Sequence, residues 1–212
     1  MGGAGGRLVA ACAATAVARF EGCVGVAARL AVVALGATIY VFTIRLADAD
    51  RAVYETLSLR VACHPSETPD YLLTRVLAYC LEYAEGIAFS NGLADPDEPA
   101  ITVRDLTGQL LSWIAIGAPE AGRLHKAGKA AARVVVYTHR DAEALLRRLH
   151  GERIHRAAAL QVHAIDRELL AALVVRLKRR MEFDLSVAER NLYITLGDET
   201  LTGVVTLHQL TN

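Results

Sequence analysis

After residue 36 the chain alternates strand-like segments with amphipathic helical segments, and this alternation constrains its fold more than any other feature. Segment 37–45 is rich in β-branched and aromatic residues, and segment 54–62 alternates apolar with polar residues. Both patterns predict strands. Asp48 and Asp50 in the connection favour a turn, which predicts an antiparallel pair.

The firmest helix prediction starts at Pro69, with Thr68 as its N-cap, and ends before Gly86. Its apolar residues keep helical spacing: Leu72, Leu73, Val76, Leu77, Cys80, Leu81 and Ala84. Similar reasoning predicts helices over 119–131, 141–149 and 166–178, the last capped by Asp166.

Short apolar runs between these helices predict further strands. They cover 100–104, 110–116, 134–136, 160–165, 182–187, 191–196 and 201–207. A helix between 110–116 and 134–136 predicts that these two strands are parallel neighbours. Residues 37–212 contain no repeat or linker, so we expect one mixed α/β domain.

The first 36 residues have a different composition, dominated by Ala, Gly and Val. The apolar run from Leu8 ends in Ala16-Val17-Ala18, which is the pattern of a secretory signal and its cleavage site. The longest later uncharged stretch, 30–44, is shorter than the roughly 20 residues of a membrane span. We therefore expect no membrane anchor.

The cysteines show neither a CxxC pair nor metal-ligand spacing with histidine. Cys80 falls on the apolar face of the predicted helix and Cys63 ends a predicted strand, so both are expected to be buried thiols. Reduced cysteines are typical of a cytoplasmic protein, which is the location we expect.

The chain has 23 basic and 23 acidic residues, and a net charge of zero argues against non-specific binding of nucleic acid over the whole surface. Local basic groups remain, and we expect any nucleic acid to be bound through them. They are Arg123, Lys126, Lys129, Arg176, Lys178, Arg179 and Arg180. The alternative is that these cations face water and the negative ends of helix dipoles.

Common catalytic signatures are absent: the sequence has no HExxH, no GxSxG, no P-loop and no GxGxxG after a strand. One constellation remains, with Glu67 before the first helix, Asp97 and Glu98 in a turn-rich loop, and Lys126 on a later helix. Carboxylates near a lysine could hold Mg²⁺ or Mn²⁺ and neutralise charge in phosphoryl transfer. The alternative is an acidic loop and a basic helix face that are simply solvated.

Several blocks of the sequence together resemble the bacterial YaeQ family. They are Ala37 to Tyr40, His64 to Glu67, the helix YLLTRVLAYCLEYAEG, the loop from Gly92 to Pro99, Trp113-Ile114, Gly117 to Pro119, and Arg123 to Ala127. The resemblance runs in order over about residues 33–207. It implies a compact variant of the PD-(D/E)XK, restriction-endonuclease-like α/β fold, and it does not establish an activity.

The resemblance also has implications for individual positions. The family start Met-Ala-Leu-x-Ala-Thr-Ile-Tyr aligns with Val33 to Tyr40, which predicts that residues 1–32 are a mistaken upstream extension. The alternatives are a disordered leader or a genuine signal for export in residues 1–18. Asp97 would be the first metal-binding carboxylate, with Glu98 beside it and Glu67 as an acid at the helix edge. Lys126 would replace the catalytic lysine of the motif.

The chain departs from the family pattern Trp-Ile-Glu-x-Gly, because Ala115 stands where the family has glutamate. An alanine cannot bind a metal, so the resemblance implies a weakened metal-dependent phosphodiesterase site. The alternative function is a non-catalytic regulatory module that binds nucleic acid or protein.

Overall fold

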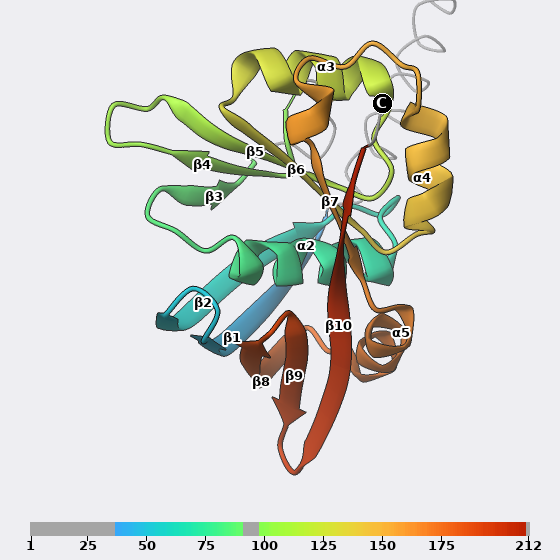
Figure 1. Cartoon of the computed structure of the whole chain (residues 1–212). Helices are drawn as coiled ribbons and strands as arrows, with labels where there is room; N and C mark the ends of the chain where they lie inside the picture. The colour runs from blue at the N-terminus through green and yellow to red at the C-terminus, as the bar shows by residue number, and fades with distance from the viewer. Residues whose placement is uncertain (1–36, 91–97, 211–212) are drawn as a thin grey trace, which may run out of the picture. The chain divides into compact units, whose positions relative to one another are not determined.

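The computed structural model describes residues 37–90 and 98–210 (Figure 1). The helices are α2 (Pro69–Leu81), α3 (Ala121–Ala130), α4 (Ala142–Leu149) and α5 (Arg167–Arg176), with a 3₁₀ turn at Ala157–Ala159. The strands are β1 (Thr38–Asp48), β2 (Val53–Cys63), β3 (Ile87–Phe89), β4 (Ile101–Arg104), β5 (Leu110–Ile116), β6 (Arg133–Thr138), β7 (Gln161–Ile165), β8 (Arg180–Ala188), β9 (Asn191–Leu196) and β10 (Glu199–Gln209). The predicted mixed α/β fold is confirmed.

The strands of this part of the chain form one sheet in the order β2-β1-β8-β9-β10-β7-β6-β5-β4-β3. The predicted antiparallel pairing of β1 with β2 and the parallel pairing of β5 with β6 are both confirmed. Strand β10 joins the two halves of the sheet, because residues 199–204 pair with β9 and residues 205–209 pair with β7. The three-residue strand β3 was not predicted.

Gly203 allows helix α5 to approach the middle of β10. A Cβ atom at position 203 would lie 2.7 Å from the Cβ of Leu169 on α5, which is closer than two carbon atoms can pack. Glycine is therefore required where the helix crosses the strand that joins the two half-sheets.

Helix α2 on one face and helices α3 and α4 on the other cover the β5–β7 part of the sheet, whereas α5 packs against β10 and α2 (Figure 1). One core contains residues of α2 and α5 together with Ile114 and Ile116 of β5. The second contains residues of α3 and α4 together with Trp113 and Ala115. Because side chains of a strand alternate between faces, Ala115 and its neighbour Ile116 belong to different cores.

Local signals explain where the helices begin. The hydroxyl of Thr68 accepts a hydrogen bond from the amide of Tyr71, which confirms the predicted N-cap of α2. Helix α3 begins at Ala121, two residues later than Pro119, because Glu120 is still extended (φ −78°, ψ 154°). The carbonyls of Ala118 and Pro119 accept hydrogen bonds from Arg148 instead.

The two cysteines that the structure describes are both free thiols. Cys80 is fully buried, as predicted, and burial raises the pKa of its thiol to about 12. Cys63 at the end of β2 is only partly buried, so the prediction of a buried thiol was wrong there. Burial and then Glu67 raise the pKa of the Cys63 thiol, which disfavours a reactive thiolate.

Candidate functional site

The carboxyl ends of β5 and β6 meet the start of α2 at Gly117, and we call this region the sheet-end site. Gly117 has φ +85°, which glycine adopts without strain, and its amide donates to the carbonyl of Tyr137 at 2.8 Å. A Cβ atom at Gly117 would lie 3.8 Å from both Tyr71 and His139. Carboxyl ends of parallel strands are the usual place for ligand sites in open α/β sheets.

Glu67 lies in the connection before α2, at the helix edge, as the sequence predicted. Its Oε2 atom accepts a hydrogen bond from the amide of His64 at 3.1 Å and lies 3.3 Å from Nη2 of Arg75. The Glu67 and Arg75 side chains are only 10% and 3% exposed. The charge of Glu67 is therefore neutralised by a buried partner, which lowers its capacity to bind a cation.

Tyr71 and His139 were not predicted as site residues. Their rings meet edge to face at 6.3 Å. Burial raises the pKa of the Tyr71 phenol, with Glu67 acting in the same direction and Arg75 and Arg123 against it. The phenol therefore stays a hydrogen-bond donor at neutral pH.

His139 follows β6 directly. Burial lowers the pKa of its imidazole, Arg140 adds to this effect, and Asp70 opposes it. Within the described residues its buried Nδ1 atom has no hydrogen-bond partner. The position of a histidine just after a parallel strand is the sequence signal that would have identified it.

Glu98, the one described residue of the predicted acidic group in this loop, contacts helix α3 beside this site. An Nη2 atom of Arg123, on α3, donates to the carbonyl oxygen of Glu98 at 2.5 Å. Strand β4 begins just after Glu98, and its first residue, Ile101, pairs with Ile114 of β5. Glu98 has an exposed side chain, whereas the predicted metal ligand Asp97 lies outside the described residues.

The other predicted residues are divided between the two faces of the sheet. Lys126 and Lys129 are exposed on α3, which covers the face opposite α2. Ala115 is 2% exposed in the second core, with Trp113 and Leu124. Glu67 thus pairs with an arginine of α2, which packs in the first core, whereas position 115 faces the second core.

Within residues 37–90 and 98–210 no three His, Cys, Asp or Glu side chains are grouped as a metal site. The family resemblance implies Mg²⁺ or Mn²⁺, which takes about six oxygen ligands in octahedral geometry. Glu67, with an arginine on the same oxygen, does not fit that requirement by itself. The predicted ion would depend on Asp97 and on the side chain of Glu98.

The second predicted basic group lies in the other half of the sheet. Arg176 ends α5 and forms an ion pair with Glu199 at 2.5 Å, and Arg180 starts β8 opposite Val41 of β1. Lys178 and Arg179 are exposed in the connection between them. The predicted cations therefore form two separate groups.

The chain's relatives share this architecture. The sequence model of the family described as YaeQ protein matches residues 33–205. The chain belongs to the YaeQ family. The uncharacterised protein YaeQ of Escherichia coli (strain K12) is 33% identical over 164 residues, which cover 76% of this chain and 90% of the relative. The Salmonella typhi YaeQ is 29% identical over 163 residues, with the same shares covered.

Solved structures of YaeQ proteins agree with the fold. The crystal structure of YaeQ from Xanthomonas axonopodis pv. citri superposes with a TM-score of 0.74 at 30% identity and covers 82% of this chain and 99% of that one. YaeQ from Pseudomonas syringae gives 0.72 at 29% identity and covers 83% and 97%. None of the helices described here is long and apolar enough to span a membrane.

Proposed function

We propose that this YaeQ family member is a nuclease-like protein with a weakened divalent-metal-dependent phosphodiesterase site at the sheet end. The hydrogen bond from Arg123 to the Glu98 carbonyl is the observation that carries this proposal, because it brings Glu98 next to the cations of α3. Acidic ligands beside lysine and arginine are the groups that metal-assisted phosphodiester hydrolysis needs.

Residues of the chain have distinct roles in this proposal. Asp97 and Glu98 would hold the ion, which would polarise a phosphoryl oxygen when bound. Glu67 would orient the His64 segment through the amide hydrogen bond that it accepts. Lys126 and Arg123 would neutralise charge on the phosphate from the α3 side, while the protonated Tyr71 phenol could donate to a phosphate oxygen.

The alternative is a non-catalytic module that binds nucleic acid or protein. Two observations favour it: Ala115 lies in an apolar core, and Arg75 neutralises Glu67. Both reduce the negative charge available for a cation, while the cations that attract phosphate remain.

A cleavage assay tests the proposal. The full chain is incubated with single- and double-stranded DNA and RNA in Mg²⁺ or Mn²⁺, with Lys126→Ala as the control for contaminating nucleases. We expect slow metal-dependent cleavage that Lys126→Ala abolishes. Absence of cleavage by the wild-type chain, or cleavage that is unchanged in the variant, would contradict the phosphodiesterase proposal and support the non-catalytic binding module.

A further inference from the structure

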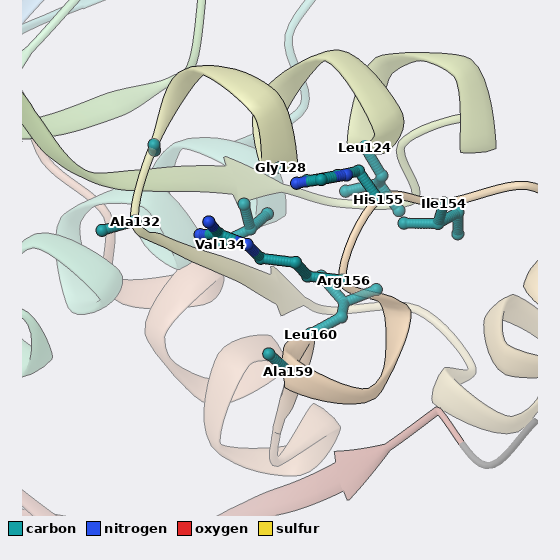
Figure 2. A pocket seen from close by; sticks show the side chains of 10 residues that line it. Leu124, Gly128, Ala132, Val134, Ile154, His155, Arg156, Ala159 and Leu160 are labelled. Carbon is teal, nitrogen blue, oxygen red and sulfur yellow. The ribbon is translucent and has the colours of Figure 1, made fainter.

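Helix α3 and the segment 153–156 form one continuous surface. The two lie so close at Gly128 that a Cβ atom there would be 2.5 Å from the carbonyl oxygen of His155. The rings of His125 and His155 meet edge to face at 6.4 Å. Figure 2 shows the His155 ring below Gly128 and the Arg156 side chain directed toward Ala132 and Val134.

Three cations of this surface have no carboxylate partner among the described residues. Lys129, Arg153 and Arg156 are exposed, and none forms an ion pair with a carboxylate of the described chain. By contrast, Arg176 in the other half of the sheet is paired with Glu199. A phosphate group would therefore bind these cations without first displacing a carboxylate.

The backbone at Arg156 is left-handed, as it is at Ala52, Glu189 and Arg190. Arg156 has φ 55° and ψ 41°, a left-handed conformation that is uncommon for a non-glycine residue. Strain of this kind is common at ligand-binding positions. Here it accompanies a guanidinium that lines the narrow space below α3.

The charge distribution along the chain points in the same direction. Residues 120–156 contain nine Lys and Arg against four Asp and Glu, in a chain whose net charge is zero. The pocket between α3 and the 154–160 segment has a volume of only about 10 Å³ and an apolar wall that includes Leu124, Ile154 and Leu160. It holds no more than a water-sized group, so a ligand would lie on the surface instead of inserting a ring.

We infer that Lys129, Arg153, His155 and Arg156 form a contact surface for the sugar-phosphate backbone of a nucleic acid. The inference deepens the proposed function, because it rests on that function for the class of partner. It assigns the contact to the α3 side of the domain and not to the second predicted basic group, Arg176 to Arg180. The C-terminal end of helix α3 would then lie at this surface, and the start of the same helix, at Arg123, would lie at the sheet-end site.

Equilibrium binding of fluorescent 20-nucleotide DNA and RNA to the full chain in EDTA tests the inference. The double variant Lys129→Gln/Arg156→Gln is compared with Lys178→Gln/Arg179→Gln, which removes the same charge from the other basic group. We expect the first variant to bind at least ten-fold more weakly than wild type at 100 mM salt. The slope of log K against log salt should become shallower by about two, while the control stays close to wild type.

Several outcomes would overturn the inference. They are absence of nucleic-acid binding at low salt, an equal loss in the control variant, and binding to phosphatidylserine vesicles that depends on the same residues. Thermal unfolding checks that the variants fold, and Lys129→Gln/Arg153→Gln repeats the test without changing the strained position. Binding in EDTA is measured separately from cleavage in Mg²⁺ or Mn²⁺. Binding in EDTA together with no cleavage in Mg²⁺ or Mn²⁺ would contradict the proposed hydrolysis alone, and cleavage that is unaffected by Lys129→Gln/Arg156→Gln would contradict this surface alone.

Discussion

The carboxylate of Glu67 lies 3.3 Å from the guanidinium of Arg75, and both side chains are almost fully buried beside the sheet-end site. The same Nη2 atom of Arg75 donates to the carbonyl of Ala62 at 2.5 Å, so the arginine ties the end of β2 to helix α2. Glu67, which was predicted to bind a metal ion, thus also helps to hold β2 and α2 together beside the site.

Removing one partner of this pair should destabilise the protein. Glu67→Gln keeps an acceptor for the His64 amide but leaves Arg75 buried without a counter-charge, so we expect the free energy of unfolding to fall by about 3 kcal/mol. Arg75→Met should have a similar effect, and the double variant should lose much less than the sum of the two. Urea denaturation of the four proteins measures this; additive losses would contradict the coupling.

Two glycines of α3 should respond in opposite directions to alanine. Gly122 has open space at its Cβ position, so Gly122→Ala should raise the free energy of unfolding by about 0.5–1 kcal/mol through helix propensity. Gly128→Ala would place its Cβ against the His155 carbonyl and should lower that free energy by about 1–3 kcal/mol. Thermal denaturation checks both; equal stabilisation would show that α3 and segment 153–156 do not approach as closely as described.

Stability should decrease as the pH falls from about 6.5 to about 4. The ring of His163 stacks on Tyr137 at 4.8 Å, and burial lowers its pKa from 6.5 to about 4, although Glu82 acts in the opposite direction. In this window the unfolded chain binds a proton that the folded protein does not, so the free energy of unfolding falls with decreasing pH and this effect levels off below pH 4. His139, whose pKa is also lowered, adds to the same slope.

Denaturant titrations between pH 8 and pH 4 measure this slope. His163→Phe keeps the stacking on Tyr137 and should flatten the curve, whereas His150→Gln, at an exposed position, should not. An NMR titration that places the pKa of His163 near 6.5 would refute the explanation.

Restoring the family glutamate should raise the affinity for divalent metal ions. Ala115→Glu puts a carboxylate into the second core, so the metal-free protein should lose about 3 kcal/mol of stability. Mn²⁺ should bind more tightly to this variant than to wild type, and its binding should restore part of the lost stability. Mn²⁺ should neither bind more tightly to Ala115→Gln nor restore the stability of that variant. Titration calorimetry that detects no gain in affinity would show that the metal site has been placed wrongly.

Much of the fold was predictable because its signals are local. The cap at Thr68, the apolar spacing of α2 and the alternation along β2 each depend on residues a few positions apart, and the structure confirms all three. Strand β3 was missed because three residues do not establish a period. The start of α3 was placed two residues early because proline at a first helical position has the same local pattern as proline before a helix.

The candidate site was predictable only in part. Glu67 lies at the helix edge, where the sequence placed it, while the metal-binding roles of Glu67, Asp97 and Glu98 remain predictions. Tyr71 and His139 were missed because their ring contact forms between α2 and the end of β6, which are far apart in the sequence.

The sequence by itself determined the type of each main element, the family of the chain and the residue types available for chemistry. Only the tertiary structure decided which of them meet. It placed Arg75 on Glu67, separated Ala115 from Glu67 by the sheet, and paired the carboxylate of Asp50 with the amide of Arg190, 140 positions away. The physical reason is that helix and strand periods are encoded over a few residues, whereas partners across a ten-stranded sheet are selected by the packing of the whole domain.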